Sequence, residues 1–181
     1  MRPTLPVVAL LCAAASLPAG AARRAVPVRR PAPPVIRLAP SQIQSLVRRS
    51  GARATLVNVW ATWCDPCREE FPWMLRAARA RRADGLRLVL ISADFDDRLA
   101  QVRRFLRGQG VSDTTYLKTG GDMPFIDALN PRWSGTLPAT FVFDPRGRVV
   151  QWWEGQADSA RFESAIRRAL APNAAQEDST R

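Results

Sequence analysis

The apolar residues of the chain follow two spacings, one typical of buried strands and one typical of amphipathic helices. Residues 55–60 (TLVNVW) and 86–92 (LRLVLIS) form two nearly uninterrupted apolar runs. Such runs are typical of central strands that are covered on both faces. Between them, residues 67–83 carry apolar side chains at helical spacing, and Gly85 can end that helix. The pattern therefore predicts a strand, a helix and a strand in succession.

The flanking segments extend this order on both sides. The further predicted elements are an edge strand at 35–38, a helix from Ser41, and a helix with apolar positions over 99–106 that ends at Gly108 or Gly110. They also include two hairpin strands at 139–143 and 148–152 and a closing helix whose apolar face covers 162–170. The hairpin strands flank Asp-Pro-Arg-Gly, a sequence that favours a tight turn. The whole order predicts an α/β domain over residues 36–171, with a mixed central β-sheet flanked by helices.

The two ends of the chain differ from this domain. Residues 1–22 have a positive start, an apolar run and then small residues, which is the order of a secretory signal peptide. An uncleaved anchor stays open, because residues 3–22 reach the roughly 20 apolar residues of a membrane span. Residues 23–38 are rich in proline and arginine and predict a linker, and residues 172–181 predict a disordered tail.

The net charge of +11 comes mainly from the first third of the chain. Nine arginines precede the first acidic residue, Asp65, and the rest of the chain is close to balance. A folded nucleic-acid interface usually shows basic clusters interleaved with aromatic residues inside the domain, and this sequence has no such motif. We therefore expect no nucleic-acid partner.

Two cysteines, Cys64 and Cys67, stand at the start of the helix that follows the first buried strand. At this spacing on a first helical turn, they can close a disulfide. The helix N-terminus favours the thiolate of Cys64, so we expect an exposed, nucleophilic Cys64. Cys67, one turn inward, would then resolve the mixed disulfide. Pro66 suits an early helical position, where its missing N–H costs little.

The complete absence of histidine limits what this site can do. It excludes a Ser-His-Asp triad, a Cys-His dyad and every metal site that uses histidine. A zinc site needs about four ligands, and the one further cysteine, Cys12, lies in the predicted leader. We expect no metal and no separate cofactor, so the redox group is the Cys64–Cys67 pair itself.

Two segments around these cysteines resemble a known family. The segment NVWATWCDPCREEFPWM (residues 58–74) is similar to the active-site region of the thioredoxin superfamily, above all to exported TlpA/ResA-like thiol-disulfide oxidoreductases. The segment GTLPATFVFDPRGRVV (residues 135–150) resembles that family's second signature, in which a proline faces the disulfide. The resemblance implies a thioredoxin-like fold and disulfide reductase chemistry. It also implies that residues 111–134 are a family-type insertion before the cis-proline strand, with one extra strand and a short helix at 123–129.

The resemblance assigns roles to the residues that would meet a partner. Cys64 matches the attacking cysteine and Cys67 the resolving one. Pro138 matches the cis-proline, whose neighbouring backbone pairs with an extended partner peptide. Leu137 departs from the Thr or Val often found before that proline, which would alter partner choice and thiolate stability. Trp63 is expected to contact partners at the rim of the site.

Other matched positions concern protons and the redox potential. Asn58 occupies the place of a buried acid, so that proton acceptor is absent. Glu70 matches an acidic residue that the family keeps near the cysteines and is a candidate for proton handling. Its simpler interpretation is a carboxylate favoured by the helix dipole. Asp65 and Pro66 are expected to tune the redox potential, and Pro72 matches a proline that kinks the helix.

Several residues carry a structural interpretation instead. The run of acids after the second strand predicts a loop that leads to a helix cap rather than a cation site, and it consists of Asp94, Asp96 and Asp97. The remaining tryptophans are expected to serve in core or surface packing, and they are Trp60, Trp133, Trp152 and Trp153.

Taken together, these features predict an exported thiol-disulfide oxidoreductase that acts in the periplasm or another extracytoplasmic space. Its substrates would be protein disulfides, and an upstream donor of the membrane thiol reductase type would re-reduce it. A disulfide oxidase or isomerase stays open, because the residues around the pair do not decide the reduction potential. A redox-inactive binding module also stays open, with the cysteine pair as a structural staple. If the leader is kept, the domain would work tethered to a membrane.

Overall fold

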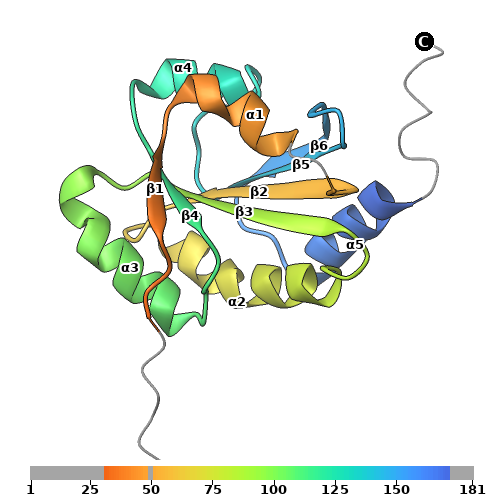
Figure 1. Cartoon of the computed structure of the whole chain (residues 1–181), viewed down its shortest axis with the longest axis horizontal. Coiled ribbons are helices and arrows are strands. Elements are labelled where there is room, and N and C mark those ends of the chain that lie inside the picture. Colours follow the sequence, from red (N-terminus) through yellow and green to blue (C-terminus); the bar gives the residue numbers. More distant parts are fainter. Residues whose placement is uncertain (1–30, 49–50, 172–181) are drawn as a thin grey trace, which may run out of the picture.

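A computed structural model describes residues 31–48 and 51–171 (Figure 1). The predicted leader, the linker up to residue 30 and the predicted tail lie outside the described residues. The elements are, in chain order, β1 (Val35–Leu38), α1 (Ile43–Val47), β2 (Ala54–Trp60), α2 (Asp65–Ala80), β3 (Leu86–Ser92), α3 (Leu99–Gly108), β4 (Thr115–Lys118), α4 (Asp122–Leu129), β5 (Ala139–Phe143), β6 (Val149–Glu154) and α5 (Ser159–Leu170). Within these ranges, every helix falls short of the length and apolarity that a membrane crossing requires.

The strands form one mixed sheet in the order β1-β4-β3-β2-β5-β6. β2 is parallel to β3 along its whole length and antiparallel to β5. β1 and β4 continue the parallel part, and β6 continues the antiparallel part. The mixed central sheet predicted from the order of apolar patterns is confirmed.

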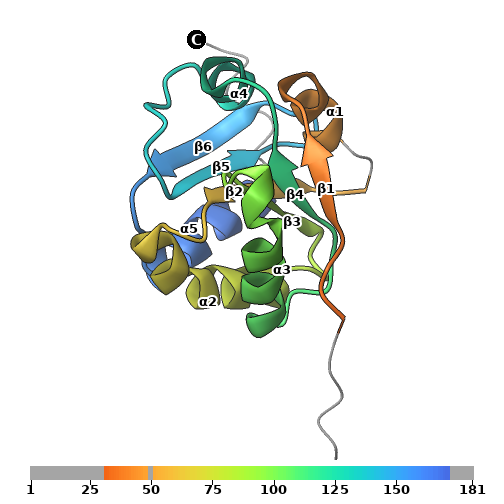
Figure 2. The same cartoon turned by 90° about the vertical axis from the view of Figure 1, so that its left-hand side faces the viewer.

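Helices cover both faces of this sheet. α2, α3 and α5 lie on one face, and α1 and α4 lie on the other (Figures 1 and 2). β2 is buried along its whole length, because its side chains alternate between the two layers. Leu56 and Trp60 belong to the core shared with α2, whereas Val57 and Val59 belong to the core shared with α1 and α4. The uninterrupted apolar run of this strand thus reflects a sheet covered on both sides.

An aromatic cluster packs two helices against the central strand. The Trp60 ring lies 5.0 Å from that of Phe71 on α2 and 4.9 Å from that of Phe105 on α3, measured between ring centroids. Phe71 and Phe105 meet edge to face at 4.9 Å. Such aromatic pairs contribute about 0.5–1.5 kcal/mol each beyond their buried area. They fix α2, which carries the cysteines, relative to the end of β2.

Several element boundaries differ from the sequence prediction, above all those of the first two helices. α2 begins at Asp65, two residues before the predicted start, because Cys64 serves as the N-cap. It also ends at Ala80, before the predicted end. The helix expected from Ser41 is a 3-10 turn, Pro40–Gln42, followed by the five-residue α1.

Two segments that the sequence places at the edges of the domain form regular secondary structure. Val35–Leu38, where the predicted linker and the predicted edge strand overlap, pairs in parallel with β4. The insertion predicted over residues 111–134 contributes one strand, β4, and one helix, α4. The extra strand and the extra helix implied by the family resemblance are therefore both present.

The β5–β6 turn has the conformation that its sequence favours. Asp144 is buried and accepts hydrogen bonds from the backbone N–H groups of Arg146 and Arg148, at 2.9 Å each. Gly147 has a φ of +76°, which few residues other than glycine adopt. Burial alone would raise the pKa of Asp144, but the hydrogen bonds from Arg148 and Arg146 outweigh it and lower that pKa. An ionised Asp144 therefore closes the hairpin.

Candidate active site

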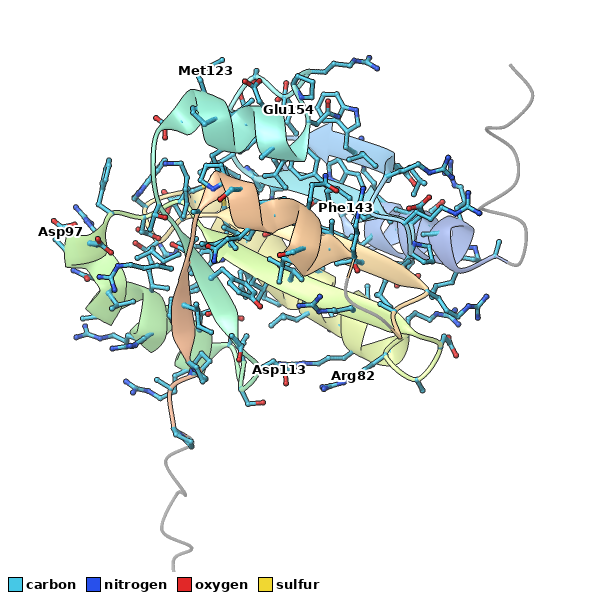
Figure 3. All side chains as sticks on the ribbon, turned by 45° about the horizontal axis from the view of Figure 1, so that its top comes forward. Arg82, Asp97, Asp113, Met123, Phe143 and Glu154 are labelled. Atoms are coloured by element: carbon cyan, nitrogen blue, oxygen red, sulfur yellow. A yellow bond between two sulfur atoms is a disulfide. The ribbon has the colours of Figure 1, made fainter. Side chains whose placement is uncertain are left out.

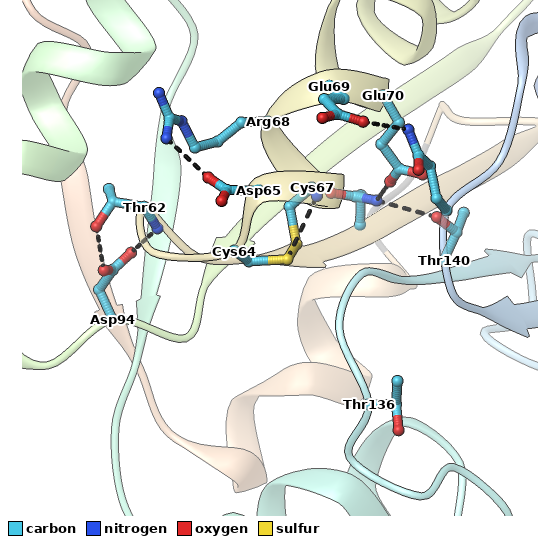
Figure 4. The surroundings of a disulfide bond; sticks show 12 residues. Thr62, Cys64, Asp65, Cys67, Arg68, Glu69, Glu70, Asp94, Thr136 and Thr140 are labelled. Carbon is cyan, nitrogen blue, oxygen red and sulfur yellow. Dashed lines mark hydrogen bonds and ion pairs between the residues drawn. A yellow bond between two sulfur atoms is a disulfide. The ribbon is translucent and has the colours of Figure 1, made fainter.

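The two cysteines lie at the carboxyl edge of the parallel part of the sheet. β2 ends at Trp60, and a short turn leads to α2, in which the Cys64 N–H donates to the carbonyl of Ala61 at 3.2 Å. Crevices at the carboxyl ends of strands are where open α/β sheets bind their ligands. Cys64 and Cys67 are joined in a disulfide, with Cα atoms 5.3 Å apart (Figure 4). The disulfide that the spacing of the two cysteines predicts is therefore present.

The burial of the pair is higher than expected. Cys64 is 6% exposed and Cys67 is fully buried, so the predicted exposed Cys64 is wrong in degree. Cys64 remains the outer of the two sulfurs, and its Sγ accepts a hydrogen bond from the Cys67 N–H at 3.3 Å. The helix N-terminus favours the Cys64 thiolate, whereas burial disfavours it. A partner must therefore approach closely to reach this sulfur.

The proline loop reaches the same edge of the sheet from β5. β5 runs antiparallel to β2 and pairs its first residue, Ala139, with Val59, near the end of β2. The preceding peptide bond, Leu137–Pro138, is cis, as the resemblance implies. Pro138 is buried, and its carbonyl accepts from the Gly155 N–H at 2.8 Å. This register brings the loop to the edge of the sheet at which the disulfide lies.

Packing and a hydrogen bond fix the conformation of the loop around Pro138. Leu137 is half-buried and packs against both core clusters. Trp133, predicted as a packing residue, lies against Phe141 and donates its indole N–H to the carbonyl of Thr136 at 2.9 Å. That carbonyl is two residues before Pro138, so Trp133 also anchors the loop.

Glu70 is a buried carboxyl behind the cysteines. It lies three residues after Cys67 on α2, a spacing that places both side chains on one helix face. Its Oε1 accepts from the Asn58 side chain at 3.0 Å, and its Oε2 accepts from the Ala157 N–H at 2.9 Å. Burial raises the pKa of Glu70 to about 7, and these two hydrogen bonds lower it only in part. Glu70 is thus a buried acid whose protonated form is favoured, and its role in proton handling stays a prediction.

Asn58 is the neighbour that connects this carboxyl to the sheet. It lies between Leu56 and Trp60 on the same face of β2, so it points toward α2. Its side-chain amide also donates to Thr140 Oγ1 at 3.0 Å, because Thr140 lies directly opposite on β5. Asn58 Oδ1 has no hydrogen-bond partner among the described residues. A buried acid therefore lies next to position 58, and Glu70 of α2 supplies it.

Asp94 corrects the prediction of a helix cap. The 3-10 turn that precedes α3 has Phe95 as its N-cap and no side-chain cap bond. Asp94 is 3% exposed and instead accepts from Thr62, from the N–H to Oδ2 at 2.9 Å and from Oγ1 to Oδ1 at 2.5 Å (Figure 4). The Ser92 hydroxyl donates to the same carboxylate at 2.7 Å. Asp94 therefore fixes the turn that leads to Cys64.

The two other acids of this run lie at the surface. Asp96 forms an ion pair with Arg37 at 3.0 Å, and both side chains are more than half exposed. Within residues 31–48 and 51–171, no group of three or more acidic or cysteine side chains is placed to hold a metal ion.

The rim residues named from the sequence are placed around the disulfide. Trp63 is 56% exposed, and Asp65 forms an ion pair with Arg68 at 3.0 Å. Pro66 occupies the first turn of α2, and Pro72 lies inside the same helix.

A family model described as the AhpC/TSA family matches residues 38–152, more than half of the chain. The chain belongs to the AhpC/TSA family. Within the curated proteins, it is 31% identical over 99 residues to the thiol-disulfide oxidoreductase ResA of Bacillus subtilis (strain 168), covering 55% of this chain and 51% of that protein. The thiol:disulfide interchange protein HelX of Rhodobacter capsulatus is 33% identical over 95 residues, or 52% and 48% of the two chains. The chain thus spans about half the length of these relatives.

Solved structures share the same architecture. A thioredoxin-family thiol:disulfide interchange protein from Chlorobium tepidum TLS superposes with a TM-score of 0.57 at 28% identity, over 70% of this chain and 83% of that one. A thioredoxin-related protein from Neisseria meningitidis serogroup B gives 0.55 at 31% identity, over 65% and 85%. The thioredoxin-like fold is therefore confirmed, and so is the kinship with ResA-type thiol-disulfide oxidoreductases.

Proposed function

We propose that the Cys64–Cys67 pair reduces disulfides of protein partners in an extracytoplasmic space. The observation that carries this proposal is the position of the pair. A disulfide caps a helix at the carboxyl edge of the sheet, beside a cis-proline loop and in front of a buried acid. The kinship with thiol-disulfide oxidoreductases supports the same chemistry.

The proposed reaction has two exchange steps. The Cys64 thiolate attacks one sulfur of the partner disulfide, so that a Cys64–partner bond forms, the partner S–S bond breaks and one partner thiolate leaves. Cys67, after losing its proton, then attacks Cys64 Sγ. The Cys64–Cys67 disulfide forms, and the second partner thiolate leaves. Two electrons have passed to the partner, and a reduced dithiol protein must return two electrons to the pair.

Glu70 is the proposed proton acceptor for the second step. Cys67 is fully buried, so bulk water does not reach its thiol directly. Glu70 lies on the same helix face, and its pKa of about 7 lets it exist in both protonation states near neutral pH. It can take the Cys67 proton during resolution and release it afterwards. Asn58 and the Ala157 N–H hold its carboxylate and act as positioning groups.

The direction of electron flow is proposed to be reductive. A strongly oxidising pair owes its potential to a well-stabilised reduced thiolate. Here Cys64 is nearly buried, and the exposed Asp65 carboxylate next to it disfavours a second negative charge. Both effects counteract the stabilisation of the Cys64 thiolate by the helix N-terminus. A less stable reduced thiolate makes the pair a better reductant. An oxidase or isomerase with this fold would need the opposite balance.

The proposed partner site uses the loop around Pro138 and the rim of the disulfide. The backbone beside Leu137 and Pro138 would pair with an extended segment of the partner, and Trp63 would pack against it. The leader over residues 1–22 would export the domain or tether it to the membrane, where a thiol reductase could re-reduce it.

A trapping experiment tests the proposal. Cys67→Ser removes the resolving thiol, so partners should accumulate as mixed disulfides with Cys64 in cells that express this variant. The double variant with Cys64→Ser as well is the matched control and should trap nothing. Recovery of equal material from both strains, or of no disulfide-linked protein from either, would reject the proposed exchange reaction.

The midpoint potential separates the alternatives. A potential in the thioredoxin range, about −270 mV, fits a reductant, and a value near −120 mV fits an oxidase. A value well below about −300 mV, with a pair that does not react with partners, fits a structural staple. Equilibration of the protein in glutathione and dithiothreitol buffers gives this number.

A further inference from the structure

Two exposed aromatic residues follow the ends of two neighbouring parallel strands. Trp63 comes after β2 and is 56% exposed, and Phe95 comes after β3 and is 75% exposed. Phe95 has the highest exposed fraction of the large apolar side chains that the structure describes. Single exposed apolar residues are common, but two at the edge of the sheet that also carries the reactive pair suggest an interaction site.

Buried polar contacts fix the backbones of these two residues to each other. The Ala93 N–H donates to the carbonyl of Trp60 at 2.7 Å, which extends the pairing of β2 and β3 by one bond. Beyond it, both hydrogen bonds from Thr62 end on the buried Asp94 carboxylate. Trp63 follows Thr62 directly, and Phe95 follows Asp94 directly. The contact between Thr62 and Asp94 therefore holds the two aromatic positions side by side. The aromatic side chains themselves take no part in that contact.

The order of the strands shows on which side of the disulfide Phe95 lies. β2, which leads to Cys64, lies between β5, which follows Pro138, and β3, which precedes Phe95. Pro138 and Phe95 thus lie on opposite sides of Cys64 along the edge of the sheet. Neighbouring strands are about 4.8 Å apart, and an extended peptide advances about 3.3 Å per residue. A peptide whose cysteine lies at Cys64 therefore reaches the Phe95 side within about two or three residues.

We infer that Trp63 and Phe95 form a docking surface for large apolar side chains two or three residues from the reacting cysteine of a protein partner. This inference rests on the proposed function and adds a substrate preference to it. Two of the rim acids are paired with neighbouring bases, which favours an apolar occupant over a charged one. Asp65 pairs with Arg68, and Asp96 pairs with Arg37, each at 3.0 Å.

The test compares two disulfide-linked peptide dimers of equal length. One carries Leu and Phe at the second and third positions on either side of its cysteine, and the other carries Ser at all these positions. The reduced protein is mixed with each dimer, and the second-order rate constant for release of peptide thiol is measured. The wild type should reduce the apolar dimer about tenfold faster, the effect of one well-packed aromatic contact. Phe95→Ala and Trp63→Ala should each bring the ratio of the two rate constants close to one.

Val150→Ala is the matched control for loss of an exposed apolar side chain. Val150 is 44% exposed and follows Val149, which pairs with Phe143 at the end of the sheet away from the disulfide. Figure 3 shows Phe143 far from Asp97, which lies two residues after Phe95. This variant should keep the wild-type ratio. A wild-type ratio near one, or a ratio that survives Phe95→Ala, would overturn the docking surface. A wild type that reduces neither dimer faster than a Cys64→Ser protein would instead overturn the proposed function.

Discussion

Asn58 donates its side-chain amide to Glu70 Oε1 at 3.0 Å, and this bond joins the strand before the disulfide to the helix behind it. Both side chains are 1% exposed. A buried carboxyl normally resists ionisation, but two hydrogen bonds to its charged form limit that effect. The result is a group whose pKa lies at about 7, far from the surface and next to the resolving cysteine. The pH dependence of stability should report this group directly.

Glu70→Gln should remove a pH-dependent part of the stability of the oxidised protein. The pKa of Glu70 is about 7 in the folded state against 4.5 ordinarily, so the folded protein keeps a proton that the unfolded chain releases. Stability from this group is therefore full below pH 4.5 and is lost as the pH rises to about 7. The free energy of unfolding of the wild type, relative to the Gln variant, should fall by about 3 kcal/mol over this range. Urea unfolding at pH 5 and pH 8 measures it.

Glu69→Gln is the matched control for this measurement. Glu69 is exposed and accepts a hydrogen bond from Gln156 at 3.0 Å, so its carboxylate lies in water rather than in the core. The control should show the same pH dependence as the wild type. If the wild type and Glu70→Gln unfold with a constant difference at both pH values, the raised pKa of Glu70 is wrong.

Asn58→Leu should raise the pKa of Glu70 further. The substitution removes the donor to Oε1 and leaves the Ala157 N–H as the described hydrogen-bond donor to this carboxyl. Loss of a bond to the charged form favours the protonated acid. The carboxyl carbon signal of Glu70, followed by NMR through a pH titration, should therefore move to a higher midpoint. Thr140→Val removes the other partner of Asn58 and should leave that midpoint nearly in place, so equal shifts in both variants would contradict this account.

Asp65→Asn should make the disulfide less reducing. The carboxylate lies beside Cys64 and disfavours its thiolate, and its removal also leaves Arg68 without the partner that now neutralises it. A more stable thiolate stabilises the reduced protein and raises the midpoint potential, here by about 10–30 mV for an exposed charge. Equilibration in defined thiol buffers measures the shift.

Asp84→Asn provides a control of the same kind on the same chain. Asp84 pairs with Arg81 at 3.1 Å, also three residues apart, just beyond the far end of α2 from the disulfide. Its loss should leave the potential unchanged. A shift of equal size in the two variants would show that general charge, and not the position of Asp65, sets the potential.

The fold was accessible to sequence reasoning because its signals are local. The run before the cysteines is apolar on both faces, and β2 is buried on both faces. The Asp-Pro-Arg-Gly turn carries its own conformational preference, and Gly147 adopts the positive φ that it needs. Helix ends were predicted less well, because Cys64 is not one of the residues that usually cap a helix.

The site was accessible only where residues near in sequence form it. The disulfide follows from a spacing of three residues, whereas the Glu70 environment depends on Ala157, 87 residues away. Nothing local marks a backbone N–H as a donor to a distant acid. One usable signal was present for Asn58, since a polar residue inside an apolar strand needs a buried partner. The same argument applied to Asp94, which lies two residues beyond the end of a buried strand.

Asp94→Asn should loosen the turn before the disulfide while the cysteines stay intact. In the wild type, each oxygen of the Asp94 carboxylate accepts one hydrogen bond from Thr62. The asparagine side chain has one oxygen and one NH₂ group, and the NH₂ group can only donate. It therefore cannot accept from both donor groups of Thr62. The loss of one buried hydrogen bond to a charged group should lower the free energy of unfolding by about 1–3 kcal/mol. The Thr62 amide should also exchange with solvent faster under native conditions.

Asp97→Asn is the control, since Asp97 is an exposed acid three residues along the same segment. It should leave both the stability and the Thr62 exchange rate within error of the wild type. In the peptide assay, Asp94→Asn should reduce the preference for the apolar dimer, because Trp63 and Phe95 lose the contact that holds their backbones together. If the Thr62 amide stays as protected as in the wild type, the Asp94 carboxylate does not hold this turn, and the aromatic pair needs another support.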